Sequence, residues 1–273
     1  MKTLYVTDLD GTLLTSEKRI SEYSKQAINQ LIEEGMEFAF ATARSLSTAS
    51  KLVEDIHFKT PIVAYNGVHV FDPQTGARIA SEGFSPEEIR DVKQIMEKHN
   101  LMPFVYSFVD GKEYVSWVNG TETKGSTAYI ADRKDDKRMR PLDTYENLYE
   151  GEVFYFSCIG PRACYEAAYE EFAQDDRFSC MMQAEPYNKE VYWLEVLPRK
   201  ASKANAILKL KEILGCDRIV SFGDGINDIP MFRISDECYA MENAVAQLKE
   251  IATGVIGNNN EDGVAKWLLD NVR

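Results

Sequence analysis

The stretch Tyr5-Val6-Thr7-Asp8-Leu9-Asp10-Gly11-Thr12-Leu13-Leu14 decides how this chain folds. Asp8 and Asp10 come directly after a short apolar run, Thr3 to Val6, that has the composition of a β-strand. Asp and Gly are also typical of turns, so a simple turn is one interpretation of the pair. The other is a pair of carboxylates at the carboxyl end of a sheet strand, where open α/β sheets bind ligands. The rest of the chain decides between the two.

The bulk composition limits the classes of protein to which the chain can belong. Its 273 residues are enough for one large domain or two ordinary ones, and the 44% hydrophobic and 27% charged fractions are those of a globular protein. The net charge of −13 disfavours nucleic acid and anionic membrane surfaces as partners, because both bind basic patches. An anionic ligand would need a metal ion or a few placed cations to offset this charge.

The sequence gives no sign of a membrane span, a secretion signal or a disulfide framework. No apolar run approaches the ~20 residues that a membrane helix needs, and the N-terminus has no signal-peptide pattern. The five cysteines are scattered and the three histidines are far apart, so we expect neither a zinc site nor a histidine-based triad. These features predict a cytoplasmic protein.

Strands and helices alternate in the first part of the chain. Ser21 is typical of a helix N-cap and Gly35 of a helix end, and apolar residues repeat between them at helical spacing. The order strand, helix, strand, helix, strand predicts a parallel, doubly wound, Rossmann-like α/β sheet. Asn66-Gly67 follows, and we interpret it as a turn in preference to a ligand contact. The expected strands are 3–6, 36–41 and 61–65, and the expected helices are 22–34 and 46–56.

A different pattern begins near residue 84. Ser85-Pro86-Glu87-Glu88 is a strong helix start, with an N-cap, a proline at N1 and a glutamate at N3. Further helices and several segments of β-forming residues follow, as in a separate α+β module, and the first pattern resumes after Pro198. We therefore predict a discontinuous core domain, 1–83 with 197–273, and an inserted α/β cap domain, 84–196.

The inserted module contains two features with open interpretations. The run Asp132 to Arg140 mixes five basic and three acidic residues, and we interpret it as a solvated loop or helix face, with phosphate binding as the alternative. Tyr187, Lys189 and Trp193 lie near the end of the module. They are candidates for substrate contact, and packing inside the module is the alternative.

Polar residues follow three predicted strands. Asp8 and Asp10 follow the first strand, Thr42 the second, and Asp224 and Asp228 a later one. Right-handed crossovers place these strand ends at one edge of the sheet. Carboxylates gathered there would repel one another unless a cation shared them. Oxygen ligands without histidine or cysteine indicate Mg²⁺.

Lys203 and Thr42 are candidates for binding an anion at this edge. Lys203 occupies the first turn of a predicted helix, where the helix dipole makes a cation unfavourable by a few tenths to ~1 kcal/mol. A bound anion would explain this position, and a lysine that points to solvent is the alternative. Thr42 offers a hydroxyl beside the backbone N–H groups of Ala43 and Arg44, as in a phosphate cradle, although threonine is also an ordinary strand residue.

Taken together, these segments resemble the four ordered motifs of the haloacid dehalogenase-like phosphatases. The motifs are Asp8 to Leu14, Thr42, Lys203 and Gly223 to Asp228, and the large insertion is similar to that of the Cof-type sugar-phosphate phosphatases. Two positions depart from the family pattern. Ala43 stands where the family usually has glycine after the threonine, and Ala204 where it has glycine after the lysine.

The resemblance implies a role for each motif. Asp8 would be the nucleophile that forms an aspartyl-phosphate, and Asp10 would be the general acid and then the general base. Asp10 would start protonated, because nearby carboxylates would raise its pKa. The implied Mg²⁺ ligands are the side chains of Asp8 and Asp224 and the backbone carbonyl of Asp10, with Asp228 binding the ion directly or through its neighbours. The implied phosphate-binding residues are Leu9, Thr42, Ala43, Arg44, Lys203 and Asn227.

The expected activity is Mg²⁺-dependent hydrolysis of small phosphorylated metabolites, in particular sugar phosphates, with the cap closing over the site and selecting the leaving group. A phosphomutase of the same superfamily is one alternative. A signalling receiver is another, although receivers are about half this length and uninterrupted. A non-catalytic binder of phosphorylated metabolites is the third. We expect a monomer or a weak homo-oligomer.

Overall fold

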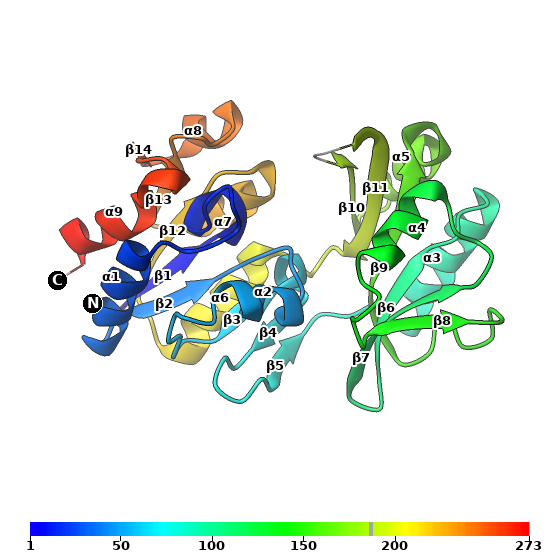
Figure 1. Cartoon of the computed structure of the whole chain (residues 1–273), viewed down its shortest axis with the longest axis horizontal. Coiled ribbons are helices and arrows are strands. Elements are labelled where there is room, and N and C mark those ends of the chain that lie inside the picture. Colours follow the sequence, from blue (N-terminus) through cyan, green and yellow to red (C-terminus); the bar gives the residue numbers. More distant parts are fainter. Residues whose placement is uncertain (186–187, 273) are drawn as a thin grey trace. The chain divides into compact units, whose positions relative to one another are not determined.

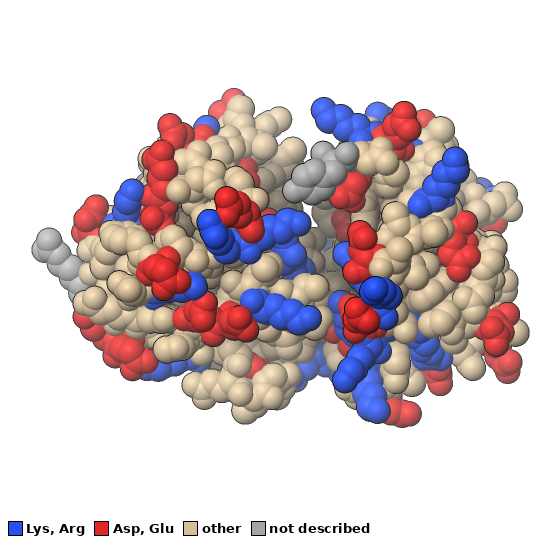
Figure 2. Space-filling model, viewed as in Figure 1, with Lys and Arg blue, Asp and Glu red and all other residues tan. Residues whose placement is uncertain are grey.

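The computed structural model describes residues 1–185 and 188–272 (Figure 1). The chain divides into two compact units, one formed by Met1–Ser81 with the segment from Ala201 onward, and the other by Glu82–Lys200. None of the described helices has the length and apolar character of a membrane span. On the face seen in Figure 2, acidic side chains are interspersed with lysines and arginines over both units.

The first unit is built on a five-stranded parallel sheet in the order β14-β13-β12-β1-β2. Strand β1 lies between β12 and β2, and Thr7 at its end is level with Phe222 and Phe40 on these neighbours. A parallel bridge between Ala41 and Val63 leads into a small antiparallel sheet, β3-β4-β5. The predicted α/β fold with a parallel core sheet is confirmed. The strands are β1 Thr3–Thr7, β2 Glu37–Phe40, β3 Ile62–Ala64, β4 His69–Phe71, β5 Arg78–Ser81, β12 Arg218–Gly223, β13 Glu237–Met241 and β14 Gly254–Ile256.

Side-chain caps fix the starts of three helices in this unit. The hydroxyls of Ser21, Ser45 and Ser202 each accept a hydrogen bond from the backbone N–H three residues later, which satisfies a donor that the helix itself leaves free. Gly215 ends α6 in the left-handed conformation that favours glycine. The helices are α1 Glu22–Glu33, α2 Leu46–Leu52, α6 Lys203–Leu214, α7 Ile229–Ile234, α8 Ala246–Ile251 and α9 Gly263–Asn271.

Large apolar side chains fill the space between the parallel sheet and its helices. Phe38, Phe40 and Phe222 are completely buried, and the ring of Trp267 on α9 packs edge-on against Phe222 at 5.1 Å between centroids. Such close packing holds the strands in fixed register. The strand ends that carry the predicted polar residues therefore have a rigid support.

The second unit contains a six-stranded sheet in the order β10-β11-β9-β6-β7-β8. Neighbouring strands are antiparallel except β7 and β8, which are parallel, so the sheet is mixed. The strands are β6 Phe104–Val109, β7 Lys112–Val118, β8 Met139–Leu142, β9 Glu152–Pro161, β10 Phe178–Glu185 and β11 Asn188–Pro198, and the helices are α3 Pro86–Lys98, α4 Lys124–Ala131 and α5 Glu166–Ala173.

The two faces of this mixed sheet differ in chemistry. Phe156 of β9 belongs to the apolar core that Met96 of α3 and Phe172 of α5 complete. Side chains alternate along a strand, so Ser157 points the other way, where its hydroxyl and that of Tyr129 on α4 both lie within hydrogen-bond distance of the Tyr106 hydroxyl. Helices α3 and α5 thus cover one face, and α4 packs on part of the other.

Of the three residues near the end of the module, only one has described contacts that decide its interpretation. The Trp193 indole N–H donates to Glu185 at 2.7 Å, and its ring packs edge-on against Tyr129, which favours packing inside the unit. Lys189 is exposed. Tyr187 lies outside the described residues.

Candidate active site

The segment after β1 is both a turn and a carboxylate site. The N–H groups of Leu13 and Leu14 donate to the carbonyls of Asp8 and Leu9, so the chain coils tightly where the strand ends. Gly11 has a φ of +72°, and an added Cβ would lie 2.2 Å from Asp224 Oδ2. Only glycine fits here without displacing Asp224, because it tolerates both the backbone conformation and the contact.

Three carboxylates from two neighbouring strands meet beside this turn. Asp8 directly follows β1, and Asp224 and Asp228 follow β12, which pairs with β1 in parallel. Carboxylate oxygens of the three residues lie within 4.8 Å of one another. Asp8 and Asp228 are buried and Asp224 is half-buried. The topology therefore brings together side chains that are more than two hundred residues apart in sequence.

The Lys203 ammonium bridges two of these carboxylates. Its Nζ lies 2.7 Å from Asp8 Oδ1 and 2.7 Å from Asp228 Oδ1, and only 1% of the lysine side chain is exposed. Burial alone would lower the pKa of Lys203, but Asp228 and Asp8 outweigh it and hold the pKa above its usual range. The alternative of a lysine that points to solvent is wrong. The cation sits at the helix start because it neutralises carboxylates inside the protein.

Asp228 stabilises the loop that carries Asp224. Its Oδ2 accepts hydrogen bonds from the backbone N–H groups of Asp224 and Gly225, both at 3.0 Å, while Oδ1 binds Lys203. Asp228 is completely buried, and a Cβ on Gly223 would lie 2.7 Å from Oδ2. Since both oxygens already have partners, Asp228 acts on the cluster mainly by holding Asp224 and Lys203 in place.

Asp8 and Asp224 are electrostatically suited to share a cation. Burial raises the pKa of Asp8 to about 7, an effect that Lys203 opposes and the neighbouring Asp228 and Asp224 reinforce. Burial raises the pKa of Asp224 to about 6, opposed by a hydrogen bond from the Thr12 hydroxyl at 3.0 Å. One ammonium beside three buried or half-buried carboxylates leaves excess negative charge. This all-oxygen donor set fits a hard divalent cation such as Mg²⁺.

Asp10 has a different neighbour from the one predicted. Its exposed carboxylate forms a two-point ion pair with Arg44, with Nε 2.6 Å from Oδ2 and Nη2 2.5 Å from Oδ1. The proton expected on Asp10 stays a prediction, and the Arg44 guanidinium is the group that its carboxyl oxygens contact. Arg44 was predicted to bind phosphate, and here it binds Asp10. The predicted metal contact of Asp10 is through its backbone carbonyl, and it stays a prediction.

The remaining predicted residues lie on segments at the same edge of the sheet. Thr42 is buried just beyond β2, and its Oγ1 accepts a hydrogen bond from the Arg44 N–H at 3.1 Å, which leaves the hydroxyl proton for another partner. Leu9 is buried next to Asp8, Ala43 is exposed, and Asn227 is half-buried in the loop after β12. Their roles in binding phosphate stay predictions.

Two residues near the cluster were not singled out as site residues from the sequence. Thr12 orients Asp224, and its place in the opening motif was the available signal. Asn66 was interpreted as a turn residue, and it is one: Tyr65, Asn66 and Gly67 all have positive φ. The Asn66 N–H donates to the Thr42 carbonyl. A Cβ on Gly67 would lie 2.1 Å from the Ser202 backbone, so this turn packs closely against both the Thr42 loop and the start of α6. Among the described residues, Asn66 Oδ1 is buried without a hydrogen-bond partner.

Comparison with known proteins places these features in a family. Residues 5–268 match the model of the haloacid dehalogenase-like hydrolases. The chain is 28% identical to a putative phosphatase of Streptococcus pyogenes, with 98% of each chain covered. It is 27% identical to a 5-amino-6-(5-phospho-D-ribitylamino)uracil phosphatase of Bacillus subtilis, with 96% of this chain and 95% of the relative covered.

Solved structures agree on the fold along the whole chain. A haloacid dehalogenase-like hydrolase from Bacteroides thetaiotaomicron superposes with a TM-score of 0.80 at 22% identity, covering 99% of both chains. A Thermotoga maritima structure gives 0.79 at 24% identity, covering 100% of this chain and 98% of the other. The family match excludes the receiver alternative. The chain belongs to the haloacid dehalogenase-like hydrolases, as a Cof-type phosphatase.

Proposed function

We propose that this protein hydrolyses small phosphorylated metabolites, in particular sugar and sugar-alcohol phosphates, through an aspartyl-phosphate on Asp8 and with Mg²⁺ as cofactor. The observation that carries the proposal is the cluster in which half-buried Asp224 lies beside the buried residues Asp8, Lys203 and Asp228. The name of the Bacillus subtilis relative, which acts on a phosphorylated ribityl compound, supports the choice of substrate class.

Asp8 would attack the phosphorus atom through a carboxylate oxygen while the bond to the leaving alcohol oxygen breaks. Mg²⁺ bound by Asp8, Asp224 and the Asp10 carbonyl would supply charge stabilisation for the transferring phosphoryl group. Lys203 would hold Asp8 ionised and in position, since its Nζ is 2.7 Å from the carboxylate. Asp228 would keep Lys203 and the Asp224 loop in register.

Asp10 would give a proton to the leaving alcohol and then take one from the water that cleaves the aspartyl-phosphate. In this cycle the proton that Asp10 gives to the alcohol is replaced by the one it takes from the water, so Asp10 starts and ends protonated. Its carboxyl group must be free of the Arg44 guanidinium, which it contacts in the structure, to exchange these protons. We propose that the phosphoryl group of an arriving substrate draws Arg44 away, so that Arg44 serves both Asp10 and phosphate in turn. Thr42, Asn227 and the N–H groups of Leu9 and Ala43 would bind the other phosphoryl oxygens.

The proposed catalytic residues all belong to the unit of Met1–Ser81 and the segment from Ala201 onward. We propose that this unit is the catalytic core and that Glu82–Lys200 is the cap that selects the leaving group. The two departures from the family pattern, Ala43 and Ala204, add one methyl group each. We expect both to be compatible with activity.

The test is the variant Asp8→Asn, which keeps the shape of the side chain and removes the nucleophile. Hydrolysis of an aryl phosphate should fall by at least about a thousandfold while circular dichroism stays unchanged. Undiminished turnover would refute the mechanism. A screen of phosphorylated metabolites with and without Mg²⁺, ranked by kcat/KM, would then identify the substrate class. Release of free phosphate from a hexose phosphate, with no isomer formed, would separate hydrolysis from the phosphomutase alternative.

A further inference from the structure

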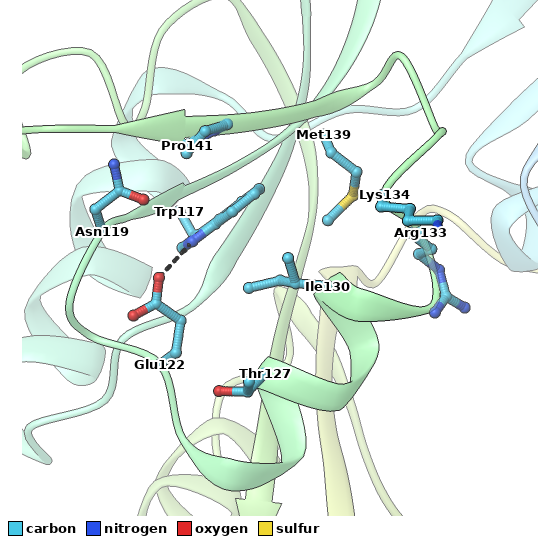
Figure 3. Close-up of a pocket in the computed structure, with 9 residues that line it drawn as sticks. All are labelled: Trp117, Asn119, Glu122, Thr127, Ile130, Arg133, Lys134, Met139 and Pro141. Carbon is cyan, nitrogen blue, oxygen red and sulfur yellow. Dashed lines mark hydrogen bonds between the residues drawn. The ribbon is translucent and has the colours of Figure 1, made fainter.

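The second unit contains a cavity of about 530 Å³ between α4 and the strands β7 and β8 (Figure 3). This volume lies within the range of small-molecule binding sites. None of the proposed catalytic residues lines it. The cavity lies wholly within the second unit.

The lining of this cavity is mixed, and its polar members are Asn119, Glu122, Thr127, Arg133 and Lys134. Trp117 of β7, Ile130 of α4, and Met139 and Pro141 of β8 line it (Figure 3). The indole N–H of Trp117 already donates to Glu122 Oε1 at 2.9 Å, and Glu122 Oε2 accepts the Gly120 N–H at 2.8 Å. The polar edge of the indole is thus satisfied within the protein. The part of the wall that the indole ring supplies is therefore apolar.

Two cations lie together at one end of the cavity. Arg133 and Lys134 follow α4 and appear side by side in Figure 3, away from Glu122. The Arg133 guanidinium stacks on the Tyr129 ring at 3.8 Å, and its Nη1 donates to the Tyr129 carbonyl at 3.2 Å, so its position is fixed before any ligand arrives.

The other arginines of the run Asp132 to Arg140 are used differently. Arg138 forms ion pairs with Asp136 and Glu113, and Arg140 with Glu150. In the described part of the chain, no carboxylate oxygen lies within 4.0 Å of a charged nitrogen of Arg133 or Lys134. Arg133 still acts on Asp136 by helping to lower the pKa of that carboxyl group, but within the lining the two cations outnumber the one carboxylate, Glu122.

We propose that this cavity binds a small organic anion with a flat apolar body, such as an aromatic carboxylate or an aryl phosphate. The apolar body would lie against Trp117, Ile130 and Met139, and its anionic group would meet Arg133 and Lys134. An inorganic anion leaves the apolar walls in contact with water, and a neutral apolar compound leaves the cations without a partner. The ligand therefore needs both parts.

The probe is 8-anilinonaphthalene-1-sulfonate, whose fluorescence rises in apolar sites and whose sulfonate supplies the anion. We expect a single site, with N-phenyl-1-naphthylamine, which has the same rings without the charge, bound at least about fivefold more weakly. The variant Lys134→Glu should weaken binding of the sulfonate by about tenfold, because it replaces attraction by repulsion. Lys137→Glu is the matched control, since Lys137 is exposed in the same run and does not line the cavity.

A second measurement separates the organic anion from bare phosphate. Phenylphosphonate, which phosphatases do not hydrolyse, should displace the probe, and inorganic phosphate at the same concentration should not. Equal binding to the wild type and to Lys134→Glu would overturn the proposal, as would displacement by inorganic phosphate alone. A change of phosphatase turnover in Lys134→Glu would assign this cation to the reaction and would overturn the proposal of a separate site.

Discussion

Replacing Lys203 by methionine removes a buried ammonium and keeps most of the side chain's volume. The ammonium contacts Asp8 and Asp228 at 2.7 Å each, and the lysine side chain is 1% exposed. Removing one partner of a buried ion pair costs ~3–5 kcal/mol, because it leaves charge in the interior without compensation. Here two carboxylates lose the same partner, but protonation of one of them would limit the loss. We therefore expect a destabilisation of about 3 kcal/mol at pH 8.

The pH dependence of this loss distinguishes an electrostatic cause from a packing defect. Without the ammonium, the folded-state pKa of Asp8 rises further above its unfolded value. A carboxyl group with a raised folded pKa binds more protons in the folded state, so the stability of the variant should recover as the pH falls from 8 to 5. A packing defect would cost the same at both pH values.

Thermal unfolding of both proteins at pH 5 and pH 8, in a metal chelator and in Mg²⁺, measures these effects. The midpoint at pH 8 should fall by about 6–12 °C, and Mg²⁺ should restore more of it in the variant than in the wild type, because an added cation replaces the lost one. Lys209→Met is the matched control, since Lys209 is exposed on the same helix. A variant within 1 kcal/mol of the wild type at pH 8, or equally destabilised at both pH values, would refute the reasoning.

The same site supports three further predictions. In a chelator, folding raises the pKa of Asp8 to about 7 and that of Asp224 to about 6, so the wild type should lose on the order of 5 kcal/mol of stability as the pH rises from 4 to 7. Mg²⁺ should remove this loss, and denaturant unfolding at each pH checks both points. Gly11→Ala and Gly76→Ala should each lower the free energy of unfolding by ~1 kcal/mol, because both glycines have positive φ. Only Gly11→Ala should abolish hydrolysis, because its Cβ would meet Asp224, whereas no atom lies within 4 Å of a Cβ at Gly76. If both variants keep full activity, the close approach of Gly11 to Asp224 has no catalytic importance. Arg44→Gln should raise KM for an aryl phosphate by roughly tenfold. The unfolding midpoint should stay nearly constant, because the ion pair of Arg44 with Asp10 is partly exposed. An unchanged KM would show that Arg44 does not bind the phosphoryl group.

The clustering of polar residues that could be anticipated from the sequence depends on local rules. Asp8 follows an apolar strand, which places its carboxylate at the edge of the sheet where that strand ends. Because strands and helices alternate, the strand after α6 runs parallel to the first and ends at the same edge. The first-turn position of Lys203 was visible as an electrostatic anomaly. The lysine could be stabilised there either by water or by buried carboxylates. The choice depends on the tertiary structure, and the sequence of the helix does not determine it.

The parts that the sequence could not predict are long-range pairings of polar side chains. Asn243 lies just before α8, which begins at Ala246, and Asn is a residue type that often caps helices. The Asn243 amide donates instead to the Gly11 carbonyl at 2.7 Å, and its Oδ1 accepts the Asn259 N–H. Asn is a good N-cap and an equally good bridge between loops, so its residue type does not distinguish the two roles. The pair of Asp10 with Arg44 was missed for the same reason.

The charge balance at the cluster explains why one lysine suffices. A second buried cation would complete the neutralisation of Asp8, Asp224 and Asp228, and the fold would gain stability in the absence of metal. It would also remove the excess negative charge that attracts a divalent ion to Asp8 and Asp224. Lys203 contacts Asp8 and Asp228, whereas Asp224 accepts a hydrogen bond from the Thr12 hydroxyl and has no contact with the ammonium. The negative charge of Asp224 therefore stays available to a divalent ion. The uncompensated charge of Asp224 therefore destabilises the protein in the absence of metal. A neutral substitution at Asp224 should raise the stability of the metal-free protein and lower its affinity for Mg²⁺.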